Sequence, residues 1–123
     1  MAFPSGSGSE RIKRFKANLT SGSDSIIHNG VSLHIYTFLS IIICNTLTAA
    51  ATFGIHIEKD GSSASGDLYY LIGGAANNHP LGGQETFVFN DKFMLEGADH
   101  LVMNGSSSCN IDVWFTFVDQ DWS

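Results

Sequence analysis

The chain has 123 residues, of which 43% are hydrophobic and 15% are charged, and its formal net charge is −6. This length fits one domain with a core that needs no disulfide or metal for its stability, and the first residues hold no apolar run of the kind that a secretory signal peptide requires. Residues 1–17 hold four of the six basic residues against one acid, whereas residues 18–123 hold two lysines against eleven acids. A basic leading segment on an acidic body predicts an arm that binds an acidic partner.

The first elements of the chain form this arm. Residues 1–10 are rich in Ser and Gly, and we expect them to be flexible until they are bound. Phe15, Ala17 and Leu19 alternate with polar residues, which is typical of an extended strand with one cationic face. We therefore predict an extended basic arm over residues 1–20 and a folded domain over residues 21–123, beginning with a turn at 21–25.

The clearest strand follows this turn. Its odd positions from Val31 to Ile43 are predicted to face the core, because side chains alternate between the faces of a strand. The even side becomes apolar at Ile42 and Cys44, which indicates a second covered face, as at the centre of a sandwich or at a subunit contact. Residues 33–53 contain no charged residue and could span a bilayer by length. Their polar residues and alternation favour two buried strands instead.

Further strands are predicted at 51–57, 68–72, 84–89 and 111–118, with shorter extended segments near 93–95 and 101–103. Polar loops at 59–67 and 73–83 separate some of them. In the last strand, Trp114 falls on the side away from the core. Seven or eight strands without a helical apolar period predict an all-β fold, a single antiparallel β-sandwich of the jelly-roll type.

No catalytic group stands out in the sequence. The five histidines show no HxxxH or HxH spacing, and no GxSxG or phosphate-binding glycine loop is present. We therefore expect no enzyme activity, no cofactor and no metal, although the 59–67 loop remains an alternative calcium site. Cys44 and Cys109 are predicted to be small buried hydrophobic residues, and whether they pair stays open. The aromatic residues offer an alternative sugar-binding platform, made of Tyr69, Tyr70, Trp114 and Trp122.

The order of elements from residue 31 to residue 118 resembles a group of small β-sandwich structural proteins of tailed bacteriophages. The shared plan is a long apolar strand with an Asn-containing break (IIICNTLTAAATFGIHI), a Lys-Asp-Gly hairpin tip, a Tyr-rich strand (LYYLIGG), a bend (LEGAD) and an amphipathic last strand (CNIDVWFTF). The bend departs from the tighter Gly-Asp form of these proteins by one inserted Ala.

The resemblance implies a capsid decoration (cement) protein on the virion surface, which binds the major capsid protein, forms a homotrimer and reinforces the assembled lattice. A neck or tail adaptor, a fibre-attachment protein or a carbohydrate-binding module are the alternatives. We expect no membrane partner and do not favour nucleic acid, because the acidic body repels phosphate. The predicted partner-binding residues are Phe3, Arg11, Ile12, Lys13, Arg14, Phe15, Lys16, Trp114 and Trp122.

Overall fold

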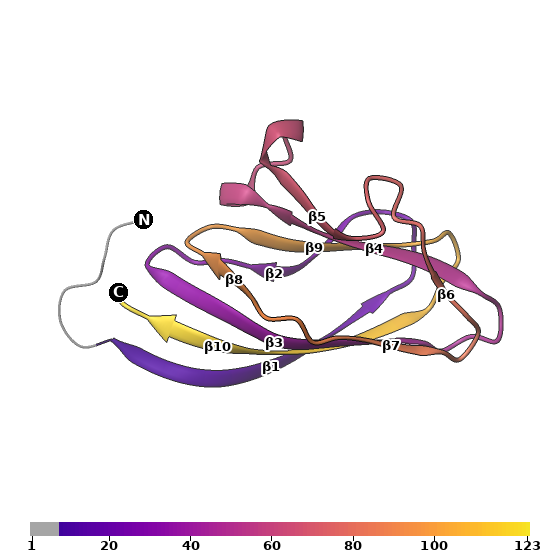
Figure 1. Cartoon of the computed structure of the whole chain (residues 1–123), viewed down its shortest axis with the longest axis horizontal. Coiled ribbons are helices and arrows are strands. Elements are labelled where there is room, and N and C mark those ends of the chain that lie inside the picture. Colours follow the sequence, from indigo (N-terminus) through magenta and orange to yellow (C-terminus); the bar gives the residue numbers. More distant parts are fainter. Residues whose placement is uncertain (1–7) are drawn as a thin grey trace.

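The computed structural model describes residues 8–123, which form two antiparallel five-stranded sheets packed face to face (Figure 1). Sheet A contains the strands β1 (Ser9–Leu19), β10 (Ile111–Asp121), β3 (His34–Asn45), β7 (Thr86–Phe89) and β8 (Phe93–Glu96). Sheet B contains β2 (Ser25–Asn29), β9 (His100–Gly105), β4 (Ala51–Glu58), β5 (Leu68–Ile72) and β6 (His79–Leu81). Two short 3₁₀ turns, η1 (Lys59–Gly61) and η2 (Ser65–Asp67), lie between β4 and β5.

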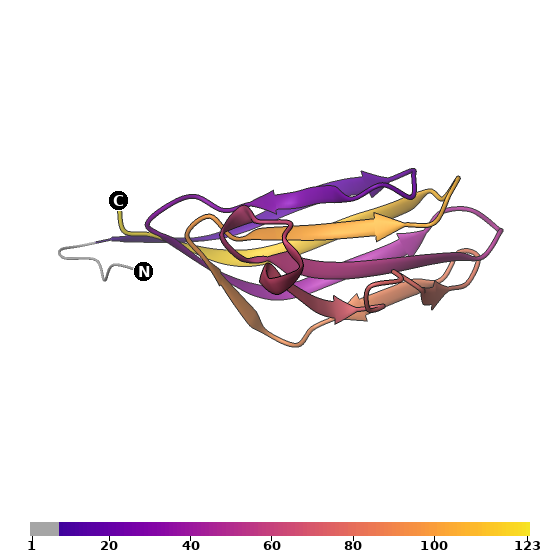
Figure 2. The same cartoon turned by 90° about the horizontal axis from the view of Figure 1, so that it is seen from above.

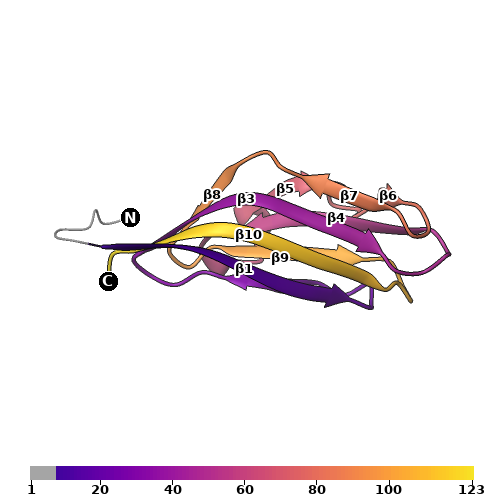
Figure 3. The ribbon, with the colours of Figure 1, turned by 90° about the horizontal axis from the view of Figure 1, so that it is seen from below.

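The strand order is that of a jelly roll. Sheet A runs β1-β10-β3 and then β7 and β8, and sheet B runs β2-β9-β4 and then β5 and β6. The chain therefore crosses to the other sheet after β1, after β2 and after β3. The late strands β10 and β9 then lie between these early strands, as in double Greek-key sandwiches. Figures 2 and 3 show the two layers from opposite sides. The prediction of an all-β sandwich of this type is confirmed.

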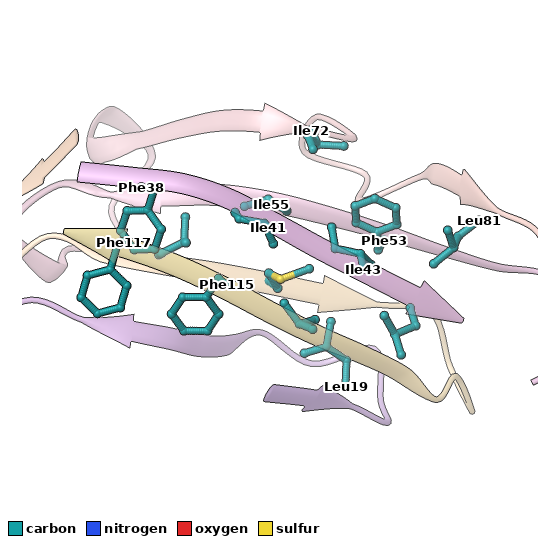
Figure 4. Packing of buried hydrophobic residues seen from close by; sticks show 14 of the residues in the cluster. Leu19, Phe38, Ile41, Ile43, Phe53, Ile55, Ile72, Leu81, Phe115 and Phe117 are labelled. Carbon is teal, nitrogen blue, oxygen red and sulfur yellow. The ribbon is translucent and has the colours of Figure 1, made fainter. Parts of the chain in front are cut away.

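The core lies between the two sheets and is built from large apolar side chains (Figure 4). Phe53 and Ile55 of β4 and Phe115 and Phe117 of β10 are fully buried or nearly so. These residues occupy the odd positions, where period-two alternation predicts the core face. The predicted buried sides of β4 and β10 are therefore the observed ones. The uncharged stretch at 33–53 forms β3 and the first part of β4.

A bulge in β3 makes half of its predicted core face wrong. Ser40 pairs with Thr116, but Phe38 pairs with Phe117, so β3 holds Leu39 as one extra residue at this point. An extra residue reverses the direction of every side chain beyond it. As a result Phe38 is buried at 0% exposure although it was predicted to face away from the core, while the core face returns to odd positions at Ile41.

The predicted boundary between arm and domain at residue 20 is also wrong for the residues that the structure describes. Strand β1 pairs with β10 over eleven registered residue pairs, from Ser9 opposite Asp121 to Leu19 opposite Ile111. Leu19 is buried in the core. Backbone hydrogen bonds with a strand about 100 residues away therefore make this segment an edge strand of sheet A, which local alternation cannot predict.

Strands β2 and β6 were not predicted. Strand β2 begins inside the predicted turn at 21–25, and β6 is three residues long and contains Pro80. Both are edge segments, held by pairing with β9 and β4 respectively. They are too short and too irregular for a period of two to emerge from their sequences. Within residues 8–123, no helix is long and apolar enough to cross a membrane.

We expect Gly54→Ala to lower the free energy of unfolding by about 1–3 kcal/mol, because a methyl group in a packed site forces its neighbours apart. Gly54 lies in β4 directly beneath Asn77, and a Cβ atom at this position would lie only 2.8 Å from the Asn77 Cα atom. The matched control is Gly66→Ala, since a Cβ atom there meets nothing within 4 Å. Urea unfolding followed by fluorescence measures both variants, and equal stabilities would contradict the close packing.

Candidate assembly interface

The side of sheet A that points away from the core, here called the outer face, is turned toward the viewer in Figure 3. The register of its strands gives this face two apolar rows that run across the strands. The strand register places these residues side by side in the first row: Lys16, Trp114, Ile42 and Val88. It places these in the second row: Ile12, Val118, Thr37 and Met94. Arg14, Thr116 and Ser40 lie between the two rows.

The apolar residues of the outer face are open to solvent. The exposed fractions are 74% for Ile12, 38% for Ile42, 51% for Val88, 54% for Met94 and 43% for Trp114. Scattered exposed apolar residues are normal on a protein surface, but a contiguous set on one face marks a surface that binds another molecule. The outer face of sheet A is therefore the candidate functional surface.

The corresponding face of sheet B is covered in part by its own chain, while Ile26 and Tyr70 on this face stay exposed. The loop that holds the 3₁₀ turns η1 and η2 lies over this sheet (Figure 2). His56 and Glu58 point to this side of β4 and are only 4% and 7% exposed. Glu58 lies 3.3 Å from the His100 Nδ1 atom and 3.7 Å from the His56 Nε2 atom. A polar cluster beneath loops therefore takes the place that an apolar exposed surface takes on sheet A.

A hollow of about 430 Å³ lies beside Trp114 on the outer face. Its lining includes Lys16, Ile42, Cys44 and Trp114. The guanidinium carbon of Arg14 lies 5.8 Å from the centre of the Trp114 ring, within the range of a cation–π contact. An exposed Trp that is flanked by a hollow and by a cation has the composition of a binding hot spot.

Four of the predicted partner-binding residues meet on the outer face: Ile12, Arg14, Lys16 and Trp114. Three others, Arg11, Lys13 and Phe15, lie on the opposite side of β1 because side chains alternate along a strand. Phe15 packs on the core of its own sandwich, with its ring 5.8 Å from that of Phe117 and 6.0 Å from that of Phe115. Phe15 thus packs on one side against the open edge of its own core, and 52% of it stays exposed.

The two remaining predicted anchors are Trp122 and Phe3. Trp122 was expected to hold the C-terminus against a neighbour, but its backbone N–H donates to the Leu33 carbonyl at 3.0 Å. Its ring lies against Gly8, where it leaves no room for a Cβ atom. Trp122 therefore holds the C-terminus to its own chain. Phe3 lies outside the residues that the structure describes.

Lys13 joins β1 to the body of the sandwich through a buried carboxylate. The Lys13 ammonium donates to Asp119 at 2.8 Å, and the His34 Nδ1 atom lies 2.8 Å from the other Asp119 oxygen. Burial alone raises the pKa of Asp119, but the hydrogen bonds from Lys13 and His34 outweigh burial and hold this pKa below its usual value. Lys13, predicted to bind a partner, is thus engaged within its own chain.

His28 lies between aromatic rings at the same end of the sandwich. Its ring centre is 4.3 Å from that of Tyr36, 4.9 Å from that of Phe117 and 5.4 Å from that of Phe38. Burial lowers the pKa of His28 from 6.5 to about 4, although the charge of Asp119 opposes this shift. His28 is therefore neutral at pH 7, and it must be protonated against the cost of burial as the pH falls.

We expect acid to destabilise the fold through His28. The unfolded chain takes up this proton below about pH 6.5 and the folded chain only below about pH 4, so stability is lost between these values as the pH falls. Because the ring is only partly buried, we expect the loss to be about 2 kcal/mol. His28→Phe removes this contribution. Urea unfolding at pH 7.5 and pH 4.5 tests it, and an equal acid-induced loss in both proteins would contradict it.

The residues that sequence analysis missed are Val88 and Met94. They lie in short strands whose outward side is seen only once β7 and β8 are placed beside β3. The apolar even side of β3 at Ile42 and Cys44 was the available indication of this surface. Cys44 lies half-buried on the outer face, Cys109 is buried in the turn before β10, and both are free.

The aromatic residues proposed as a sugar platform do not come together. Tyr69 and Tyr70 lie in β5 of sheet B, whereas Trp114 lies in β10 of sheet A. A platform needs its rings on one surface. In the part of the chain from residue 8 onward, no group of three or more His, Cys, Asp or Glu residues is arranged to hold a metal ion.

No family model matches this chain, and no curated protein matches it. Solved structures do. A chain from a structure described as Bacillus endospore appendages, which form a family of disulfide-linked pili, matches with a TM-score of 0.52 and 14% identity, over 100% of this chain and 97% of that chain. A chain of infectious bursal disease virus, Gx strain, matches with a TM-score of 0.53 and 8% identity, over 94% of this chain and 34% of that one.

A chain from the Gt strain of the same virus matches with a TM-score of 0.51 and 10% identity. This chain spans about a third of the length of the two virus chains. At such low identity these likenesses show that the sandwich fold is shared. They agree with the jelly-roll topology that the strand order gives.

Proposed function

We propose that this protein is a non-catalytic structural subunit that packs into a larger protein assembly, and in particular that it decorates a bacteriophage capsid. The outer face of sheet A is the observation that carries the proposal. It carries apolar residues on each of its strands and stays uncovered, while loops of the chain cover His56 and Glu58 on the equivalent side of sheet B. An exposed apolar surface of this kind is typical of a site that becomes buried against another protein.

Two paired clusters of charged residues and histidines favour a structural role over a catalytic one. Lys13, His34 and Asp119 line a hollow of about 350 Å³ at the open side of the sandwich, where they pair with one another. Glu58 pairs in the same way with two histidines of sheet B. A general base or nucleophile needs a free group that faces a substrate. These pairs instead join strands of the same sheet.

The contact with the capsid is assigned to the projecting end of sheet A. There β1 begins beside the end of β10, beyond the rest of the sandwich (Figure 3). Arg11 is exposed at this end, and Phe3 belongs to the segment that precedes it. A cation here forms charge-assisted hydrogen bonds with carboxylates of the major capsid protein. The phage resemblance implies a homotrimer, and the mass of the purified protein tests this implication.

The second candidate is a subunit of a self-assembling fibre. The match to the chain of the endospore pilus favours it, because that match covers nearly all of both chains. A fibre subunit and a decoration protein share the need for an exposed packing surface, so the outer face alone does not separate them. The two differ in what the purified protein does by itself, since a fibre subunit polymerises and a decoration protein requires a preassembled lattice.

Particles that contain this protein distinguish these functions. We expect quantitative mass spectrometry of purified virions to give a copy number that matches the capsid lattice, whereas a neck or tail adaptor matches the single portal vertex. Particles stripped of the protein should rebind the wild type and the control variant Tyr69→Glu, which alters an aromatic residue on sheet B that is 67% exposed. They should not rebind a variant that lacks residues 2–12. Absence from virions would contradict the proposal.

A further inference from the structure

We propose that a second copy of the same chain covers the outer face of sheet A, with the two sheets packed face to face about a twofold axis parallel to the strands. This inference rests on the proposed function and names the first partner in the assembly. Its evidence is the size of the face, the pattern of its rows and the charges at its two edges.

The outer face has nearly the area that a stable dimer requires. Four strands side by side, about 4.8 Å apart and about 11 residues long at 3.3 Å per residue, give a face of roughly 600–700 Å². A standard protein interface buries about 800 Å² on each partner. Packing of two such sheets with interleaved side chains is the usual arrangement inside a β-sandwich. The outer face of a second copy therefore has nearly the area that a standard interface needs.

The charges at the two edges of sheet A select the orientation. Strand β1 presents Arg14, Lys16 and one acid, Glu10, on the outer side, while the opposite edge holds the acids Glu85, Asp91 and Glu96 against one Lys. An axis parallel to the strands places β1 of one copy over β7 and β8 of the other, so that an edge of net positive charge meets an edge of net negative charge, although Glu10 then lies at the level of Glu96. A twofold axis perpendicular to the strands places β1 over β1, and Arg14 then meets Arg14.

The rows also match in the orientation that the charges select. A rotation about an axis parallel to the strands keeps each row at the same height along the strands. It places the β1 end of a row over the β7 or β8 end of the same row in the other copy. Trp114 of one copy then lies over Ile42 of the other, within the same apolar row. Arg14 lies midway between the levels of Val88 and Met94, where the connection that contains Asp91 joins these two strands. Arg14 and Asp91 of the second copy are therefore the expected ion pair.

Edge-to-edge pairing through β1 is a weaker arrangement. β1 is an exposed edge strand, and its basic side chains are of the kind that protects an edge against strand addition. Pairing through this edge would also leave the apolar rows of the outer face exposed to solvent. Packing through faces therefore uses the apolar surface, and packing through edges does not.

The first test is the mass of the purified full chain in sedimentation equilibrium over a range of micromolar concentrations. We expect a species of twice the 13.3-kDa mass of the chain. Trp114→Glu should raise the dimer dissociation constant at least about 30-fold, as expected for an interface hot spot. Tyr69→Glu, the exposed aromatic residue on sheet B, should leave it unchanged. Both variants should keep the circular dichroism spectrum of the wild type, since both residues are exposed.

The second test concerns orientation. Arg14→Glu and Asp91→Lys should each weaken the dimer, and the double variant should restore it to within about threefold of the wild type, as for a direct ion pair in a double-mutant cycle. If the dissociation constant of the double variant rises by the product of the two single-variant factors, the residues do not pair and the proposed axis is wrong.

The outcomes separate this inference from the proposed function. A monomer at all concentrations, or a trimer, overturns the twofold pairing. Rebinding to stripped virions then decides the proposed function independently. If the wild type is monomeric and Trp114→Glu no longer rebinds, the outer face serves the lattice and the pairing alone is wrong. If the dimer forms but the protein is absent from virions, the pairing holds and the decoration function is wrong.

Discussion

Phe38→Ala is expected to lower the free energy of unfolding by about 3–5 kcal/mol, the range for removal of a large side chain from a packed core. Phe38 is fully buried and stacks on Phe93 with ring centres 4.9 Å apart. The bulge at Leu39 places Phe38 there, since simple alternation directs it to the other side of β3. Urea unfolding measures the loss, and its midpoint is expected to shift strongly.

Leu39→Ala is the matched control for this prediction. Alternation without the bulge makes Leu39 the core residue, whereas the structure leaves it half-buried and outside the core cluster. We expect a loss of about 1 kcal/mol or less, as for positions outside the core. If Leu39→Ala costs more than Phe38→Ala, then the bulge, and with it the composition of the outer face, is wrong.

Asp119→Asn has the second largest expected effect, a loss of about 2–3 kcal/mol at pH 7. Asp119 is 5% exposed and accepts hydrogen bonds from Lys13 and His34, so the neutral amide weakens two contacts that join β1, β10 and β3. Because Lys13 remains partly open to water, the loss stays below that for a fully buried pair.

The effect of Asp119→Asn should depend on pH with a definite sign. The folded state holds the pKa of Asp119 below its usual value, so its stabilisation is present above the unfolded pKa and is lost as the pH falls through the folded value. The stability difference between wild type and variant should therefore shrink below about pH 4. The control is Asp60→Asn at an exposed site. A difference that is constant from pH 7 to pH 3 would contradict the ion pair.

The strands that alternation predicted well have one side in the core along their whole length. In β10, Val113, Phe115 and Phe117 face the core and Trp114 faces outward, as period two requires. In β3 the same rule fails for the residues that precede the bulge at Leu39, because one extra residue reverses the direction of the side chains. A bulge depends on the register with β10, which is a long-range property that a local pattern does not contain.

For the candidate site, too, the predicted basic arm shows what a local pattern can and cannot predict. Its alternation correctly predicted a strand with a cationic side, but whether that strand is free or paired depends on β10. Pairing divides the predicted anchors between two sides of sheet A, so that Arg14 and Lys16 join Trp114 while Lys13 turns to Asp119. The apolar rows follow from four strands lying side by side, which is why the sequence revealed only the part at Ile42 and Cys44.

The central claim is that the outer face of sheet A is an assembly surface. Its most direct test is a cryo-electron microscopy reconstruction of the protein in its assembled state, either in native particles or as the purified oligomer. We predict that Trp114, Ile42 and Val88 are buried between subunits in that reconstruction, with the loops over sheet B facing solvent. A reconstruction in which every copy leaves Trp114 and its row in solvent would contradict the claim.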